Sequence, residues 1–137
     1  MPLWKRLGFL FVFVVPALMP AAAWLGARSG RADLMAWFPL FFLFVLLPLV
    51  DYGFGHDPAN PTAEEAKQLE ADRWFRLMTL AALPAQLGVL AWSGWHFAHA
   101  GFGPAGIVGW LLSQGIVGGV LAITVAHELI HKDTALE

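Results

Sequence analysis

The chain has 137 residues, of which 58% are hydrophobic and 13% are charged, and its formal net charge is −2. Because a soluble domain carries about a quarter charged residues, this composition predicts a protein embedded in the lipid bilayer, and no basic cluster indicates nucleic-acid binding. The sequence has no cysteine. Disulfides and thiolate ligands are therefore excluded, and any metal ion would be bound through nitrogen and oxygen atoms.

Charged residues are absent from residues 7–27, 34–50 and 77–126. A helix needs about 20 predominantly apolar residues to span a bilayer, and each of these runs approaches or exceeds that length. We therefore predict an all-α integral membrane bundle with four transmembrane helices and a polar loop between the second and the third. The predicted helices cover about residues 4–27, 33–50, 74–98 and 104–131.

The first predicted helix has a competing interpretation as a secretory signal. Lys5 and Arg6 precede the apolar run, and Pro20 is followed by three alanines, as at a cleavage site. The apolar sequence continues through Trp24 to Ala27, which makes it long enough to span. We favour a retained helix, and a mature N-terminus near Trp24 would contradict it.

The second predicted helix contains Pro39 and Pro48, which membrane helices tolerate better than soluble helices do. It is followed by the substantial polar segment of the chain, residues 51–72, whose first half is rich in glycine and proline and is predicted to be a loop. Thr62 and Glu65 then form a capping-box pattern, which predicts a helix that leads towards the third span.

The fourth predicted helix is rich in small residues. Gly115 and Gly119 form a GxxxG pair, which allows another helix to approach closely. We interpret this pair as packing inside the bundle rather than as a dimer interface. The other small residues of the helix are Gly106, Gly109, Ser113, Gly118 and Ala122.

Charge and tryptophan predict the orientation of the bundle. Four spans place both termini on one side of the membrane. If that side is the cytoplasm, Arg28 and Arg31 are the outer basic residues and the other Lys and Arg residues are inside, as the positive-inside rule requires. Trp4 and Trp74 then fall at the inner interface and the other tryptophans at or near the outer one. We expect a multi-pass protein of the inner membrane with cytoplasmic N- and C-termini.

The histidines fall into groups on opposite sides of this predicted membrane. His127 and His131 are four residues apart at the cytoplasmic end of the fourth helix, so one helix face can present both imidazoles to one metal ion. His96 and His99 lie at the outer end, across a hydrocarbon core about 30 Å thick, and we interpret them as interfacial polar residues. We interpret His56 as a solvated loop residue.

Three interpretations fit the stretch His-Glu-Leu-Ile-His at residues 127–131. It could be a solvated helix end with no metal. It also matches the HExxH motif of zinc metalloproteases, with His127 and His131 as ligands and Glu128 as general base, although no third ligand is evident. The remaining interpretation is a histidine-box di-iron site, which a longer resemblance favours.

Residues 127–132, HELIHK, resemble the first histidine box of the alkane 1-monooxygenase family, the membrane alkane hydroxylases. Residues 47–51 (LPLVD), 54–61 (FGHDPANP) and 69–73 (LEADR) resemble the loop between that family's second and third spans. Their order, spacing and predicted membrane side match, so the resemblance covers nearly the whole chain. Residues 1–137 are thereby identified as the N-terminal part of a fatty acid desaturase/alkane hydroxylase-like membrane domain.

The resemblance implies a non-heme di-iron monooxygenase that hydroxylates the terminal carbon of alkanes, using O₂ and electrons from rubredoxin. It implies that His127 and His131 are iron ligands, and that Glu128 and Lys132 support the ligands without binding the metal. It also implies that the second span lines an alkane channel. Leu43, on the inner half of that span, is our candidate for a side chain that limits the length of the substrate.

The sequence departs from the family in its number of histidines. Two plausible iron ligands are fewer than a di-iron centre needs, and the family's later HxxHH boxes and remaining spans are absent from these 137 residues. We therefore expect a fragment of the hydroxylase that is inactive alone. An alternative from another class is a non-catalytic membrane subunit, which would donate its histidines to a partner chain that carries the others.

Overall fold

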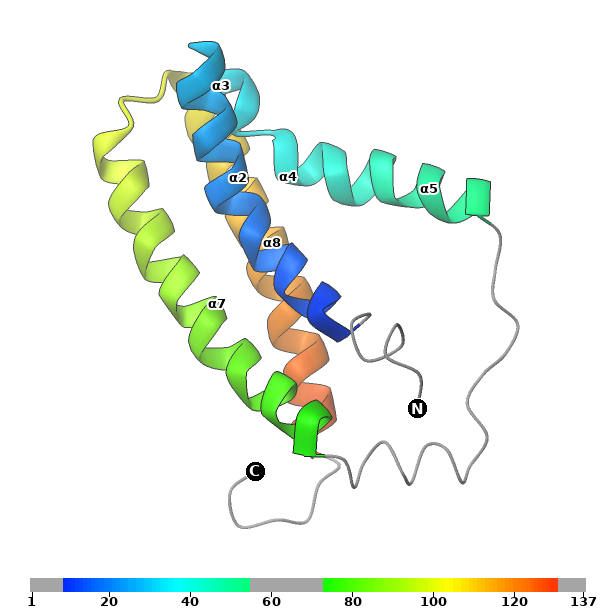
Figure 1. Ribbon diagram of the computed structural model, residues 1–137. Coiled ribbons are helices and arrows are strands. Elements are labelled where there is room, and N and C mark those ends of the chain that lie inside the picture. The colour runs from blue at the N-terminus through cyan, green and yellow to red at the C-terminus, as the bar shows by residue number, and fades with distance from the viewer. Residues whose placement is uncertain (1–8, 55–72, 131–137) are drawn as a thin grey trace.

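The computed structural model describes residues 9–54 and 73–130, which are helical apart from short turns and contain no strand (Figure 1). The predicted all-α class is confirmed for these residues. The loop and the capping box at Thr62 and Glu65 lie outside them. In chain order the elements are the 3₁₀-helix η1 (Phe9–Phe13), α2 (Val14–Ser29), α3 (Ala32–Met35), α4 (Phe38–Phe41), the π-helix η2 (Phe42–Leu46), α5 (Leu47–Phe54), α7 (Arg73–His99) and α8 (Pro104–Ile130).

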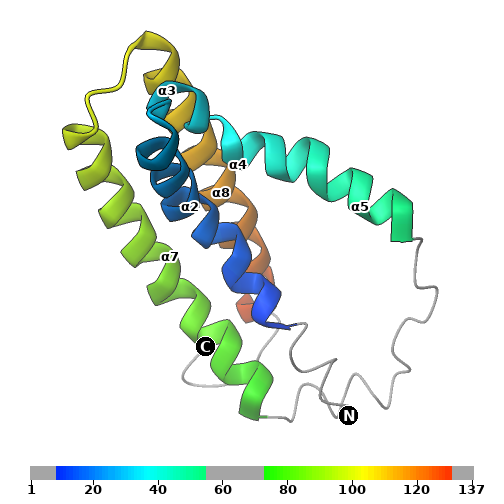
Figure 2. The ribbon, with the colours of Figure 1, turned by 45° about the horizontal axis from the view of Figure 1, so that its top comes forward.

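Three long helices, α2, α7 and α8, form a bundle in which each contacts the other two (Figures 1 and 2). A short turn joins α7 to α8, so these two helices run antiparallel side by side. Gly30 ends α2 and Gly101 follows α7, with φ angles of 66° and 64°. These left-handed conformations carry no penalty for glycine and are a common way to end a helix.

The second predicted helix is broken near its start. α3 lies against α2 and α8 at one end of the bundle, a turn follows at residues 36–37, and α4, η2 and α5 then lead away from the bundle (Figure 1). By length and composition, Ala32–Gly53 is still the helical run in the described residues that qualifies as a candidate span. The described apolar part of α8, Pro104–Val120, is shorter.

Three hydrogen bonds attach the segment around α3 to the first half of α8. One of them places the Asp33 carboxylate at the N-terminus of α8, where it accepts a backbone N–H that the helix itself leaves unpaired and where the helix dipole favours negative charge. Another provides a hydrogen-bond acceptor for the buried hydroxyl of Ser113. The bonds run from Gly103 N to Asp33 Oδ1 (2.9 Å), from Trp37 Nε1 to the Ala105 carbonyl (3.1 Å) and from Ser113 Oγ to the Ala36 carbonyl (2.7 Å).

The small residues of α8 differ in what they contact. A Cβ atom at Gly109 would lie 2.5 Å from Trp37 Nε1, and one at Gly106 would collide with the Asp33 carboxylate. By contrast, a Cβ atom at Gly115 or Gly119 would meet nothing within 4 Å among the described residues. Close helix packing therefore uses the first glycines of α8, and the expected packing contact at the GxxxG pair is not found in the described part of the chain.

We expect Gly109→Ala to lower the free energy of unfolding by about 1–3 kcal/mol, the usual cost of overpacking. The added methyl group would displace the Trp37 indole and break its hydrogen bond to α8. Gly115→Ala is the matched control, because it adds the same methyl group where there is room and should be neutral or stabilising by up to about 1 kcal/mol. Unfolding of both variants in mixed detergent micelles measures the difference, and equal effects would contradict it.

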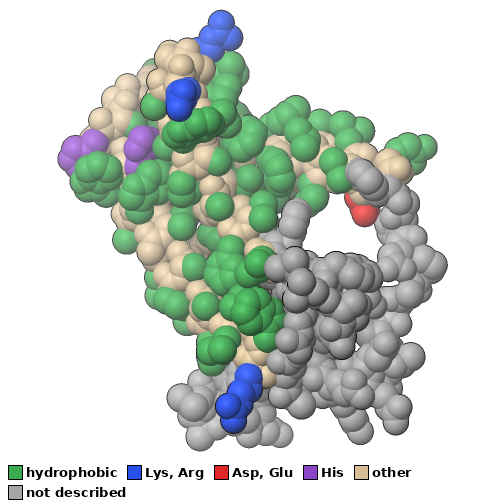
Figure 3. Space-filling view, in the orientation of Figure 1, with side chains coloured by type: hydrophobic (Ala, Val, Ile, Leu, Met, Phe, Trp, Pro, Cys, Tyr) green, Lys and Arg blue, Asp and Glu red, His purple; other side chains and the backbone are tan. Residues whose placement is uncertain are grey.

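The core lies where the three long helices meet, and the exterior is apolar. Met19, Trp110 and Val117 are almost completely buried, and the Trp110 indole donates to the Ser93 carbonyl at 3.3 Å. Large hydrophobic side chains cover the outside, while the visible Lys and Arg side chains lie mainly at the two ends of the bundle (Figure 3). Exposed apolar surface of this extent needs a partner, and lipid would provide one.

Candidate metal centre

α8 carries the first residues of the candidate metal site without interruption. The helix runs for 27 residues from Pro104 to Ile130, so its backbone brings His127 and Glu128 to its C-terminal end. The positions of their side chains are outside what the structure describes, as are the whole of His131 and Lys132. The shared face of His127 and His131 therefore remains a prediction from their spacing.

His96 and His99 are far from this end of α8. The His96 ring packs on Trp110 with centroids 4.9 Å apart. Trp110 precedes His127 by 17 residues on the same helix, which corresponds to about 26 Å at a rise of 1.5 Å per residue. Metal–ligand bonds are about 2 Å long, so this separation excludes a metal ion shared by His96 and His127.

His96 and His99 have different surroundings. His99 is exposed and its Nδ1 donates to the Trp95 carbonyl one turn earlier at 2.7 Å, which fits the expected polar residue at a helix end. His96 instead lies in a cluster of aromatic rings, contacting Trp92, Phe102 and Trp110. Among the side chains that the structure describes, which exclude those of His127 and Glu128, no group of three or more His, Asp or Glu could hold a metal ion.

Leu43 lies in the π-helix η2, whose five residues form the middle of the run that leads away from the bundle. Its side chain is half-buried and packs against the hydrophobic core, together with the neighbouring Phe42. The next side chains, Phe44 and Val45, are 62% and 42% exposed. π-helical segments are rare and occur frequently at functional sites, and nothing in the sequence pattern predicted this one.

The α7–α8 interface contains polar groups that the sequence analysis did not single out. Gln86 and Ser93 on α7 are buried, and the Gln86 Oε1 and Ser93 Oγ atoms have no hydrogen-bond partner in the described structure. Both amide atoms of Gln114 on α8 are in the same situation. The available signal for these buried groups was the occurrence of isolated polar residues within the long uncharged run from 77 to 126. Polar groups in an apolar interior are costly unless they are satisfied or functional.

The described part of the chain is all-helical, with an apolar exterior and one candidate membrane span, Ala32–Gly53. No family model matches the chain. The chain is 39% identical over 135 residues to alkane 1-monooxygenase 2 of Pseudomonas aeruginosa. This alignment covers 97% of the chain and 36% of that protein. Its identity to alkane 1-monooxygenase 2 of Alcanivorax borkumensis is 37%, and to alkane 1-monooxygenase 1 of P. aeruginosa it is 38%, each covering 97% of this chain and 35% of the relative.

Over 97% of its length the chain is similar to proteins named alkane 1-monooxygenase. The family resemblance found in the sequence is therefore confirmed. The chain spans about a third of the length of the curated relatives that it matches.

Proposed function

We propose that the chain is the N-terminal part of a membrane monooxygenase that hydroxylates the terminal carbon of alkanes with O₂. The observation that carries this proposal is the alignment of 97% of the chain with proteins named alkane 1-monooxygenase. The alternative of a zinc metalloprotease explains residues 127–131 alone, whereas the relatives align over nearly all of the sequence. Measuring the iron and zinc content of the full-length polypeptide tests whether it is the monooxygenase or the metalloprotease.

The proposed cofactor is non-heme iron, two ions in the complete protein. His127 and His131 would hold iron from the end of α8, and Glu128 and Lys132 would orient the ligating imidazoles or brace the helix end, as groups around a metal site commonly do. The donor chemistry fits, because imidazole suits iron and the chain offers no competing thiolate. Bound iron would supply the activation of O₂, and the remaining ligands would come from outside these 137 residues.

We place this site at the cytoplasmic end of a four-helix membrane bundle, with spans at about residues 4–27, 33–50, 74–98 and 104–131. The candidate span Ala32–Gly53 and the apolar exterior of the bundle support a membrane location. Rubredoxin would deliver electrons on the cytoplasmic side. The alkane would reach the site through the apolar interior, which excludes water and accepts hydrocarbon without cost.

We expect the isolated 137-residue chain to be inactive, because two histidines cannot complete a di-iron site. The test compares this chain with the full-length native polypeptide in membranes that contain rubredoxin and its reductase. Conversion of an n-alkane to the 1-alcohol is measured with ¹⁸O₂, so that label in the alcohol reports oxygen insertion. Activity of the isolated chain would refute this expectation, and a full-length protein without activity would refute the proposed function.

The size of the native polypeptide separates the fragment from the alternative of a non-catalytic subunit. An antibody against residues 51–72 should detect a band well above 15.0 kDa, the mass of these 137 residues. A band at 15.0 kDa together with a co-purifying chain that carries further histidines would favour the subunit instead.

A further inference from the structure

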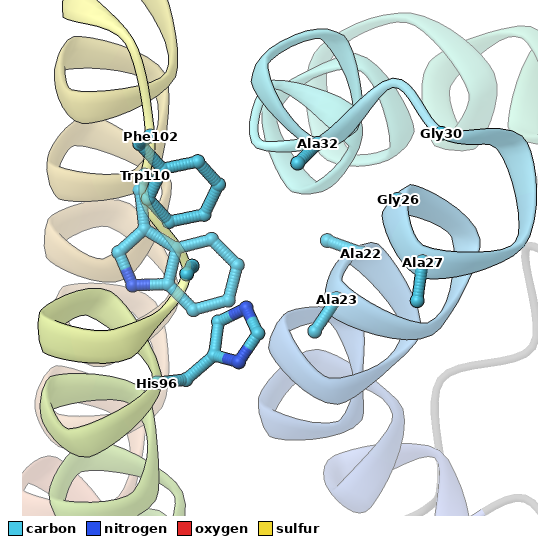
Figure 4. A pocket seen from close by; sticks show the side chains of 10 residues that line it. Ala22, Ala23, Gly26, Ala27, Gly30, Ala32, His96, Phe102 and Trp110 are labelled. Atoms are coloured by element: carbon cyan, nitrogen blue, oxygen red, sulfur yellow. The ribbon is translucent and has the colours of Figure 1, made fainter.

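A cavity of about 280 Å³ lies at the end of the bundle opposite the candidate metal centre. One wall is the face of α2 that carries Ala22, Ala23, Gly26 and Ala27, and the other wall carries His96, Phe102 and Trp110 (Figure 4). His96 and Trp110 are in contact, so the distance of about 26 Å along α8 also separates this cavity from His127. The cavity is therefore a different place from the proposed site of oxidation.

The two walls have complementary character. Ala22 and Gly26, like Ala23 and Ala27, are four residues apart and share a helix face, so α2 offers a shallow surface without long side chains. The opposite wall is a set of contacting rings, with Phe102 and Trp110 centroids 5.3 Å apart and His96 and Phe102 centroids 5.9 Å apart. Small side chains facing aromatic rings leave room for a hydrocarbon chain between them.

His96 supplies the polar group of this cavity. The indole N–H of Trp110 is already bonded to the Ser93 carbonyl, and the nearby His99 is bonded to its own helix and does not line the cavity. No hydrogen bond to the ring nitrogens of His96 is found within the described residues. None of the described lining residues is charged, and Arg28 on α2 lies instead over the Trp24 ring, 5.1 Å from its centroid. The lining therefore disfavours ions and matches a neutral ligand with one hydrogen-bonding group.

We propose that this cavity binds a neutral amphiphile, whose hydroxyl or ester carbonyl group bonds to His96 and whose hydrocarbon chain lies between the α2 alanines and the aromatic rings. The volume is close to the lower end of the range for ligand pockets, about 300–1,000 Å³. It fits the head and the first carbons of a chain, while the remainder extends into the bilayer. A fatty alcohol and the ester region of a membrane lipid share this chemistry. The proposal stands whether or not the proposed function holds.

Photo-cross-linking of the full-length protein in nanodiscs tests the location. The probe is 1-decanol with a diazirine on its chain, and its adducts are mapped by mass spectrometry. We expect adducts within residues 22–32 and 96–110. Ala27→Phe should lower this labelling at least tenfold, because Ala27 lines the cavity and is exposed, so that a larger side chain fills the space without disturbing the core. Ala17→Phe, also exposed on α2 but outside the cavity, is the matched control.

A second pair of variants tests the hydrogen bond. His96→Phe keeps an aromatic ring against Trp110 but removes the ring nitrogens, and should weaken decanol labelling about two- to tenfold, as the loss of one neutral hydrogen bond implies. The same variant should label normally with a diazirine derivative of decane, which cannot form that bond. His99→Phe should leave both probes unaffected. Undiminished labelling in Ala27→Phe, or equal loss of decane and decanol labelling in His96→Phe, would overturn the proposal.

The lipid of the nanodisc identifies the source of the ligand. Ester-linked phospholipids carry the carbonyl that His96 would bind, and ether-linked phospholipids lack it. Weaker decanol labelling in ester-linked than in ether-linked nanodiscs would support a bilayer lipid as the natural occupant. Equal labelling in the two, lost in Ala27→Phe, would support a free alcohol.

Discussion

Replacing either His127 or His131 by alanine should abolish alkane hydroxylation by the full-length protein and lower its iron content. Each substitution removes one imidazole from the proposed iron site, to which this region would contribute only two ligands. Loss of a group that merely orients a ligand typically costs about 10- to 100-fold in metal affinity or activity. Loss of a ligand itself should therefore cost more than about 100-fold. Iron per polypeptide and 1-alcohol formation are measured together on each variant.

His99→Ala is the control for this pair. It also removes an imidazole near a helix end, but its side chain is exposed and, within the described residues, hydrogen-bonds to the Trp95 carbonyl of its own helix. We expect normal iron content and normal activity. If His99→Ala lost as much iron as His127→Ala, the assignment of the ligands to the end of α8 would be wrong.

Glu128 distinguishes the monooxygenase from the metalloprotease. In an HExxH protease the glutamate is the general base, so Glu128→Gln would abolish activity while the metal stays bound. In the proposed di-iron site Glu128 only supports the ligands, and Glu128→Gln should retain part of the activity, with any loss of activity matched by a loss of iron. Complete inactivation with an unchanged metal content would favour the protease chemistry.

The sequence predicted the parts of the fold that depend on local composition. α7 ends at His99 and α8 begins at Pro104, close to the predicted boundaries at 98 and 104, because Gly101, Gly103 and Pro104 favour a turn between them. The break at residues 36–37 was not predicted. Pro39 in the first turn of α4 was the available signal, because proline lacks the N–H that a continuous helix needs there. The hydrogen bonds from Asp33 and Trp37 to the start of α8 accompany the break and could not be predicted, because they join residues far apart in the sequence.

The same contrast between local patterns, which can be predicted, and contacts between helices, which cannot, holds for the candidate sites. Spacing and family resemblance singled out His127 and His131 as candidate ligands, because i and i+4 positions share a helix face, and this stays a prediction because their side chains lie outside the described structure. The close packing at Gly109 and the cavity beside His96 could not be predicted, since each needs a partner from another helix, Trp37 in the first case and the α2 alanines in the second. The available signal for the cavity was the repeat of small residues four apart in residues 22–30, and it gained meaning only opposite an aromatic wall.

Leu43→Trp should shorten the longest alkane that the full-length enzyme oxidises. Leu43 is half-buried and packs towards the core from the π-helix η2, so a larger side chain there would narrow the proposed alkane channel. One methylene group in an apolar pocket changes discrimination by about 10- to 200-fold. Substrates whose ends reach the indole should therefore lose at least about tenfold in kcat/KM, while shorter alkanes keep theirs. The measurement is the kcat/KM profile across n-alkanes of increasing length.

Two further variants test whether Leu43 limits the length of the alkane. Leu49→Trp introduces the same side chain on α5, at a residue that is 64% exposed, and should leave the profile unchanged. Leu43→Ala removes volume and should extend the profile towards longer alkanes, the opposite direction to Leu43→Trp. General damage to the fold would lower kcat/KM for all lengths alike, whereas a side chain that limits the channel moves the cut-off in both directions. An unmoved cut-off in both Leu43 variants would show that η2 does not line the path of the alkane.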